Sequence, residues 1–423
     1  MKAILFTGAS VWDGSGAASY VADVLVADSR VSAISRNLGQ LSGADADIIK
    51  ASGWTLMPGM VEGHAHLSFE NVTRGEDLSL APPEEQTLLT ARNAKLLLDC
   101  GFTSAYSGAA AKLRLDVVVR DEIEAGHLFG PRIRAATPEI TVSGGLGDEN
   151  LLHFPRQSSA LIVDGTTEMR KLVRICVRER CDNIKLNASG DPFTPNTPAT
   201  SSPMTLEEIK TAVEVAHEFG RKVNVHARSA ESIKRSLRAG VDVLYHCEHA
   251  DEEALDLMEE SKDRIFVAPT VALLHTMVHE AAPFGITKEV VAAMQLQPLL
   301  EASQRTHTEL RKRGIRHLIG GDFGFPWNPQ GAQARDLQLF VDYFGYTPAG
   351  ALQCATVNGG ALMMGENQLG RIAEGMLADL LLVDGDPLAD LSVLQDRGKI
   401  LAVVKNGVLY KNLIKGNRYG EAA

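Results

Sequence analysis

Short apolar runs separated by turn residues mark both ends of the chain, and this pattern is typical of β-strands. In the N-terminal part the runs cover residues 3–6, 21–26, 30–35 and 47–50. In the C-terminal part they cover residues 378–383 and 400–404, and the dipeptide Asn406-Gly407 provides a turn. Because strands of this kind gather at the two ends, we expect residues 1–58 and 364–423 to form one small β-sandwich domain.

The middle of the chain, residues 59–363, follows a different pattern in which helices and strands alternate. Thr205 is a helix-capping residue with Glu208 three positions later, and an apolar stripe at helical spacing runs from there to a stop at Gly220. An apolar run suited to a buried strand, 222–226, follows at once. The same unit recurs before residues 102, 241 and 315, which indicates parallel strands connected by helices.

Eight candidate strands can be counted in this middle part. They end near His64 and His66, Ser104, Thr137, Lys185, His226, His246, Pro269 and Asp322. Eight such units predict an α/β fold with a (β/α)8 TIM-like barrel over residues 59–363, whose active site would lie at the carboxyl ends of the strands. The proline-rich residues 190–203 are expected to form a long loop above the fourth strand.

Composition and charge restrict the possible partners. Of the 423 residues, 45% are hydrophobic and 22% are charged, as in ordinary globular chains. Lys and Arg number 42 against 53 Asp and Glu, and the resulting net charge of −11 argues against nucleic acid as the main partner. No apolar run approaches the roughly 18 residues that a membrane span needs. We therefore expect neither nucleic-acid nor membrane partners.

The cysteines indicate the redox compartment. The five of them are scattered, odd in number and without a Cys-x-x-Cys pair, which argues against a disulfide framework and against a thiolate zinc site. The first residues become polar too early for a signal peptide, although a chain from which a leader had been removed would look the same. A reduced compartment, and hence a cytoplasmic location, is the expectation.

Side chains that bind metals stand at several candidate strand ends. His64 and His66 alone are weak evidence, because two histidines in a surface turn give the same pattern. His226, His246 and Asp322 end three further strands, and imidazole and carboxylate groups are ligands that suit zinc. A lone histidine or aspartate at a strand end usually has an ordinary structural explanation. Their coincidence favours a metal site on the barrel axis.

Lys185 selects the type of metal site. It closes an apolar strand, where a buried charge is costly unless it is paired or chemically modified. A protonated lysine would be repelled by divalent cations, whereas a neutral amine can react with carbon dioxide to give a carbamate that bridges two metals. A mononuclear site needs no such bridge. Lys185 therefore favours two metals over one, with a plain structural lysine as the alternative.

The chain resembles the amidohydrolase superfamily, whose signature is similar to Leu56-Met-Pro-Gly-Met-Val-Glu-Gly-His64-Ala-His66-Leu. The resemblance continues at Ile184-Lys185, Val225-His226-Ala227, 239–246, Gly320-Gly-Asp322, 351–361 and 370–380. Within the superfamily the chain is most similar to the branch of Xaa-Pro dipeptidases and ochratoxinase, binuclear zinc amidases related to imidazolonepropionase. Nearly the whole chain takes part in the resemblance.

The resemblance implies two zinc or other divalent metal ions per chain. His64, His66 and Asp322 would hold one metal, and His226 and His246 the other, with carbamylated Lys185 as the bridge. The metals would make hydroxide available near neutral pH, and Asp322 would move a proton from the attacking water to the leaving amine. The resemblance also implies a homo-oligomer.

The substrate pocket departs from the family pattern at one point. Many dipeptidases of this branch carry Gly-Gly-His-Gly after the third strand, whereas this chain has Ser143-Gly-Gly-Leu146-Gly-Asp148. Leu146 and nearby Phe154 suit an apolar or aromatic acyl group. Further candidates, each with a structural alternative, are Arg228 for a substrate carboxylate, His249 for the oxyanion or substrate, and Phe323, Phe325 and Trp327 for an aromatic pocket. No role is assigned to His153, His275, His279, His307 and His317.

These patterns predict a binuclear zinc amidohydrolase with a small-molecule amide substrate. The expected substrate is an N-acyl amino acid or a dipeptide-like compound, of the ochratoxin-like N-acyl-phenylalanine type or the Xaa-Pro type. Three alternatives stay open: a mononuclear deaminase or cyclic-imide hydrolase on the same barrel, a lactone or phosphotriester hydrolase, and a binding protein that has lost its metals. Lys185 argues against the first, and the complete set of ligand candidates argues against the last.

Overall fold

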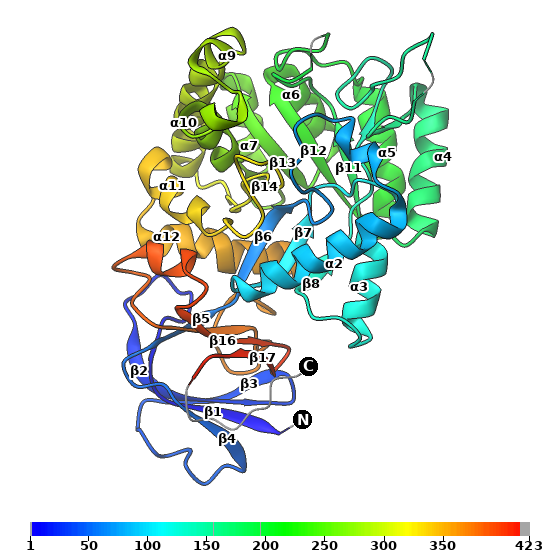
Figure 1. Cartoon of the computed structure of the whole chain (residues 1–423). Helices are drawn as coiled ribbons and strands as arrows, with labels where there is room; N and C mark the ends of the chain where they lie inside the picture. Colours follow the sequence, from blue (N-terminus) through cyan, green and yellow to red (C-terminus); the bar gives the residue numbers. More distant parts are fainter. Residues whose placement is uncertain (1, 155, 195, 415–423) are drawn as a thin grey trace.

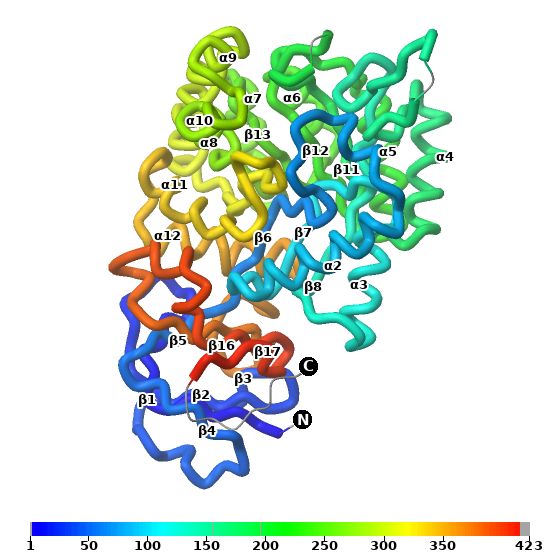
Figure 2. The backbone as a smooth tube through the Cα atoms, in the orientation of Figure 1, coloured from blue at the N-terminus to red at the C-terminus, as the bar shows by residue number. Residues whose placement is uncertain are grey.

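The two ends of the chain enter the same β-sheet. A computed structural model describes residues 2–154, 156–194 and 196–414. Within these residues an eight-stranded sheet has the order β17-β16-β15-β5-β1-β2-β3, with β4 paired to β1. Its strands are β1 (Ala3–Val11), β2 (Tyr20–Ala27), β3 (Arg30–Ser35), β4 (Ala46–Lys50), β5 (Thr55–Pro58), β15 (Leu380–Val383), β16 (Ile400–Lys405) and β17 (Val408–Asn412). Figure 1 and Figure 2 show blue and red segments lying together in this lower part of the molecule.

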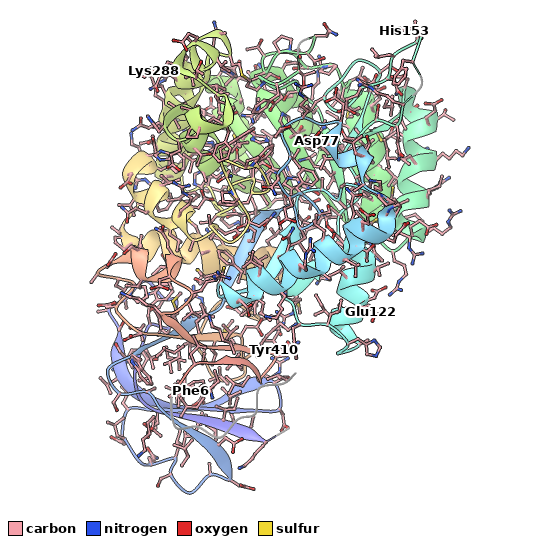
Figure 3. The ribbon with its side chains drawn as sticks, in the orientation of Figure 1. Phe6, Asp77, Glu122, His153, Lys288 and Tyr410 are labelled. Atoms are coloured by element: carbon pink, nitrogen blue, oxygen red, sulfur yellow. The ribbon has the colours of Figure 1, made fainter. Side chains whose placement is uncertain are left out.

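The predicted strands at both ends are confirmed, and two more strands complete the sheet. β5 was not expected as a separate strand because all four of its residues are buried, so it shows no alternation of apolar and polar positions. It pairs parallel with β1 and antiparallel with β15, and it thereby joins the strands of the two chain ends. Phe6, labelled in Figure 3, is fully buried in the core of this sheet.

The middle of the chain forms two parallel sheets. One has the order β6-β7-β8, and the other has the order β10-β9-β11-β12-β13-β14. Their strands are β6 (Met60–Ala65), β7 (Phe102–Ser107), β8 (Arg132–Arg134), β9 (Ile140–Thr141), β10 (Leu161–Ile162), β11 (Asn183–Asn187), β12 (Lys222–Ser229), β13 (Val243–His249) and β14 (Phe266–Ala268). The expected α/β fold with parallel strands is therefore confirmed. β9 and β10 were not predicted, because two residues are too few to show a pattern.

Helices connect the parallel strands and surround them (Figure 1). The longer ones are α2 (Pro83–Asp99), α3 (Leu115–Glu124), α4 (Gly165–Arg178), α5 (Leu206–Glu218), α6 (Ala230–Ala239), α7 (Glu252–Glu260), α8 (Val271–His279), α10 (Leu296–Lys312) and α11 (Arg335–Phe344). Short helices are α1 (Asp77–Leu80), α9 (Lys288–Ala293), α12 (Pro348–Gln353) and α13 (Gly359–Met364). Among the described helices, none combines the length and the apolar character required to cross a membrane.

Helix α5 forms where its capping signals predict it. The Thr205 side chain accepts a hydrogen bond from the Glu208 amide, and the Glu208 side chain accepts one from the Thr205 amide. This reciprocal pair satisfies two amides that have no partner inside the helix. The helix buries Ile209, Val213 and Ala216 on the stripe that the sequence indicated.

The last of the eight expected strands forms only a single bridge. His317 pairs with Val267, the Leu318 amide donates to the Val267 carbonyl (2.8 Å), and the Gly63 amide donates to the Ile319 carbonyl (2.9 Å). Beyond this point Gly320 and Gly321 provide no side chains to favour an extended strand, and Asp322 adopts a left-handed φ of 59°. Residues 317–319 nevertheless contact both β14, through Val267, and β6, through Gly63.

A buried ion pair connects the sheet of the chain ends to the parallel sheets. Arg132 on β8 contacts Asp379, just before β15, at 2.6 Å, and the Asp379 side chain is fully buried. Asp379 also accepts a hydrogen bond from the Asn406 amide (2.8 Å). Tyr410 on β17, labelled in Figure 3, packs edge-on against the Phe129 ring at the same junction. Charge pairing and aromatic packing therefore fix the two parts against each other.

Replacing Asp379 by asparagine should destabilise the protein. The change keeps the shape of the side chain but leaves Arg132 without its counter-charge, and breaking a buried pair costs about 3 kcal/mol. The free energy of unfolding in urea measures this loss. As the control, Asp47→Asn breaks the exposed Lys2–Asp47 pair and should cost less than about 1 kcal/mol. Equal losses in the two variants would contradict the role given to the junction.

Candidate metal centre

All six residues predicted as metal ligands line one pocket. The pocket has a volume of about 600 Å³ and opens at the carboxyl ends of the parallel strands. The residues in question are His64, His66, Lys185, His226, His246 and Asp322. Five of them have relative exposures of 1–4%, so their polar atoms depend on one another and on the pocket for partners.

The first ligand group consists of His64, His66 and Asp322. Their donor atoms lie within 4.8 Å of one another. His66 Nε2 is 3.2 Å from His64 Nε2 and 3.2 Å from Asp322 Oδ1. His64 itself stacks on the Tyr245 ring at 3.7 Å between centroids, which holds its imidazole in place.

The hydrogen bonds of His66 determine which of its nitrogens is free. His66 Nδ1 lies 3.0 Å from the Ala109 carbonyl oxygen, which can only accept, so Nδ1 carries the proton of the neutral ring. Nε2 therefore directs a lone pair at the carboxylate of Asp322. The Nδ1 atom of His64 is buried and has no hydrogen-bond partner among the described residues. Electron-pair donors facing one another in a buried place fit a divalent cation between them.

The second ligand group consists of Lys185, His226 and His246. His226 Nε2 donates to the Gly190 carbonyl (3.0 Å), which leaves Nδ1 free for a ligand. His246 Nδ1 lies 2.6 Å from Thr270 Oγ1, and the Thr270 hydroxyl donates to the Pro269 carbonyl. The hydroxyl oxygen must then accept from Nδ1–H, which leaves His246 Nε2 free. The two imidazole rings lie 4.2 Å apart between centroids.

Lys185 is held in an environment that disfavours its charge. Its exposure is 1%, and burial lowers the pKa of its amine. The Nζ atom lies 4.8 Å from the centre of the Tyr245 ring and 3.8 Å from Glu139 Oε1. A neutral amine in this position has the reactivity that carbamylation requires. The chemistry of these donors therefore fits two metals with a bridge.

Positive charge around Asp322 favours its ionised form. Burial by itself raises the pKa of a carboxyl group, but His64, His66 and Lys185 in their charged forms outweigh it and lower the pKa of Asp322 below its ordinary value. A divalent cation beside neutral imidazoles would act in the same direction. The left-handed φ of 59° at this residue turns its side chain at the end of the segment. An ionised carboxylate within the first ligand group can both bind a cation and accept a proton.

Arg228 forms ion pairs with carboxylates inside the protein and does not line the pocket. Its Nε donates to Asp191 Oδ2 (2.9 Å), its Nη1 donates to Glu248, and only 1% of the residue is exposed. Two carboxylates therefore compensate its charge, and it is not among the described residues that line the pocket. The expected contact with a substrate carboxylate does not form in this geometry, because the guanidinium is already committed.

The other residues predicted for substrate binding separate into two sets. Leu146 and Phe325 line the pocket. Phe323 and Trp327 are buried in the protein core. His249, the last residue of β13, is half-buried, and the Phe154 residue is 60% exposed to solvent. The loop that carries Phe154 and the neighbouring His153 projects from the outer edge of the molecule (Figure 3). None of these four is among the described residues that line the pocket.

Several lining residues were missed by sequence reasoning. Phe69, Val72, Leu78, Phe193 and Leu273 were not predicted, and together with the predicted Phe325 they form the apolar wall of the pocket. Charged lining residues include Arg74, Arg156 and Glu139, and Arg156 lies 3.3 Å from Glu76. Phe69 and Glu139 follow predicted strand ends by a few residues, and this position was the available signal. Leu78 lies on α1 and Leu273 on α8, and the others belong to loops whose course no local pattern indicates.

Comparisons with known proteins agree with this geometry. Ochratoxinase from Aspergillus niger is 28% identical over 378 residues, which cover 84% of this chain and 75% of that protein. A solved Xaa-Pro dipeptidase with methionine in its active site is similar with a TM-score of 0.86 and 26% identity, covering 97% of this chain and 100% of that one. A solved prolidase complexed with N-methylphosphonate-L-proline has a TM-score of 0.87 and 25% identity, with coverages of 97% and 100%. The profile of the amidohydrolase family matches residues 55–410, and the chain belongs to that family.

Proposed function

We propose that this protein is a binuclear zinc amidohydrolase that cleaves the amide bond of an N-acyl amino acid or a dipeptide-like substrate. As a member of its family it is a hydrolase of carbon–nitrogen bonds. The observation that carries the finer proposal is the convergence of both ligand groups on one pocket beside an apolar wall. The substrates named for its relatives, ochratoxin and Xaa-Pro peptides, support an amide with a bulky apolar part.

The barrel is part of the proposal. Single hydrogen bonds connect the two parallel sheets. After β8 the Thr137 amide donates to the Asn183 carbonyl of β11 (3.2 Å), and the Gly63 amide of β6 donates to the Ile319 carbonyl (2.9 Å), whose segment bridges to β14. These contacts support a closed ring of eight strands over residues 59–363. Residues 1–58 and 364–423 would form the second domain, for which we propose a β-sandwich; residues 1 and 415–423 of this range lie outside the described residues.

We assign one metal to the first ligand group and the other to His226 and His246, with carbamylated Lys185 as the bridge. Bound zinc would supply a hydroxide near neutral pH and polarise the substrate carbonyl. The protein's own contribution is the fixed orientation of its imidazoles. One nitrogen each of His66, His226 and His246 is held by a carbonyl or hydroxyl oxygen, and the His64 ring stacks on Tyr245. The rings therefore need little rearrangement to bind.

Asp322 would act as the proton carrier of the reaction. Because it is ionised in the resting site, it can take the proton of the attacking water and then give it to the leaving amine. The apolar wall excludes water around the scissile bond. Arg74 lines the same pocket and would offer positive charge to a free carboxylate on the substrate, the role that the paired Arg228 leaves vacant, whereas Arg156 is already paired with Glu76.

Asp322→Asn should retain metal but lose most activity. The asparagine oxygen can still face a cation, whereas the amide cannot accept a proton, and loss of a general acid–base group lowers kcat by about 100- to 10,000-fold. Metal content by elemental analysis, measured beside kcat on a cleaved amide, separates the two effects. Undiminished turnover in a zinc-loaded variant would refute the assignment of Asp322.

Lys185→Met should reduce the metal content from two ions per chain to one or none, because the variant has no amine from which a bridge could form. The matched control is Lys405→Met, which removes another buried lysine whose Nζ donates to the Gly130 carbonyl (2.6 Å) at the domain junction. The control should retain both metals. A Lys185→Met protein that still binds two zinc ions with wild-type affinity would contradict the bridging role.

A panel of amides tests the substrate class. Zinc-loaded protein should cleave N-acyl-phenylalanine or Xaa-Pro compounds in preference to Xaa-Lys amides, because Phe69, Phe193 and Leu273 of the lining would favour an apolar substrate group. Product amino acids can be quantified by chromatography. If none of the amides is cleaved while lactones, phosphotriesters or cyclic imides are, the proposed substrate class is wrong and one of those alternatives holds.

A further inference from the structure

Two buried imidazoles and the partly buried Tyr346 form a chain that leads to the backbone of His246. His307 on α10 contacts the His246 carbonyl oxygen through Nε2 (2.6 Å). Its Nδ1 lies 3.1 Å from Nε2 of His317, and Nδ1 of His317 lies 2.8 Å from the Tyr346 hydroxyl. Both imidazoles are fully buried, and neither lines the pocket among the described residues.

The carbonyl at one end of the chain determines every proton position. A carbonyl oxygen can only accept, so His307 carries its proton on Nε2 and presents a lone pair at Nδ1. His317 must then donate from its own Nε2 and accept at Nδ1 from the Tyr346 hydroxyl. Burial lowers the pKa of His307 to about 4, in agreement with two neutral rings. The three side chains therefore have one consistent arrangement of donors and acceptors.

His246 needs such support because its backbone leaves the regular strand. His246 and Cys247 have left-handed φ angles of 75° and 64°. The pairing of β12 with β13 skips from Ala227–His246 to Ser229–His249, which marks a bulge at this point. The Arg228 amide opposite the bulge donates to Ser189 Oγ, so it does not continue the ladder.

Helix α10 holds the bulge at two places. Thr306 donates its hydroxyl to the Glu248 carbonyl (2.9 Å), and the adjacent His307 donates to the His246 carbonyl. A non-glycine residue with left-handed φ costs of order 1–3 kcal/mol and persists only where its surroundings enforce it. The bulge turns the His246 imidazole into the pocket, where Thr270 then orients the ring.

We propose that His307, supported by His317 and Tyr346, is a positioning residue that fixes the backbone of the metal ligand His246. The inference rests on the proposed binuclear centre, since only there does His246 bind metal. His307 acts from behind the strand and touches neither substrate nor metal. Its role is to keep one imidazole of the second ligand group at the right place and angle.

Cobalt binding to metal-free protein in bicarbonate buffer tests this inference. Wild-type protein should bind two Co²⁺ ions per chain, resolved by visible absorbance and calorimetry. His307→Leu should weaken one of the two binding events by about 10- to 100-fold, the usual cost of losing a group that supports a ligand, and should leave the other unchanged. His307→Gln should restore most of the affinity, because its amide can donate to the His246 carbonyl and accept from His317.

The matched control is His275→Leu, which removes an imidazole from α8 that lies 2.9 Å from the Tyr343 hydroxyl and leads to no ligand. Both cobalt events should be unchanged in this control. Wild-type cobalt binding in a folded His307→Leu protein, or equal weakening of both events, would overturn the inference. Wild-type protein that binds fewer than two Co²⁺ ions would instead overturn the binuclear centre.

A milder variant keeps the inference testable if His307→Leu does not fold. Tyr346→Phe retains the ring and removes only the hydroxyl that donates to His317. It should weaken the same cobalt event by a smaller factor, with unchanged circular dichroism. Cobalt affinities equal to those of the wild type would show that the chain of hydrogen bonds does not reach His246.

Discussion

The structure depends on the close approach of electron-pair donor atoms, the imidazole nitrogens and carboxylate oxygens that line one pocket. His66 Nε2 lies 3.2 Å from both His64 Nε2 and Asp322 Oδ1, and its other nitrogen is committed to a carbonyl. In a dry interior such an arrangement is unfavourable unless a positive charge lies between the donors. The hydrogen bonds around the site hold these donors together. A divalent cation is the group that such an arrangement suits, and it links the local geometry to hydrolysis.

The rest of the fold serves to bring these donors together. Parallel strands end at the same side, so residues far apart in the chain, such as His64 and His246, meet at one place. Departures from regular strand geometry occur at the candidate ligands. The left-handed residue His246 lies at the bulge within β13, beside α10, and the left-handed Asp322 follows the segment that bridges to β14. Backbone strain of this kind persists because the surrounding helices and hydrogen bonds enforce it. The sheet of the chain ends then anchors β8 through Arg132 and Asp379.

Local patterns predicted the repeating units and the residues at strand ends, because both depend on neighbours in the sequence. Examples of the repeating units are helix α5 and strand β3. The residues at strand ends are the six ligand candidates, which meet in one pocket. The contacts of long side chains could not be predicted from the sequence. No residue close to Arg228 in the sequence indicates that Asp191 and Glu248 compensate its charge. Loop residues were similarly hidden, since Phe154 projects outward while Phe69 and Phe193 enter the wall. The sequence indicated no role for His307, because this residue on α10 acts through its contact with the bulge in β13, which no pattern near His307 reveals.

Anomalous diffraction at the zinc absorption edge, from crystals grown with zinc and bicarbonate, tests the central claim most directly. The account predicts two anomalous peaks on the pocket floor, one between His64, His66 and Asp322 and one beside His226 and His246, with additional density on Lys185 that reaches both. A single peak, or an unmodified Lys185 amine beside two metals, would contradict it.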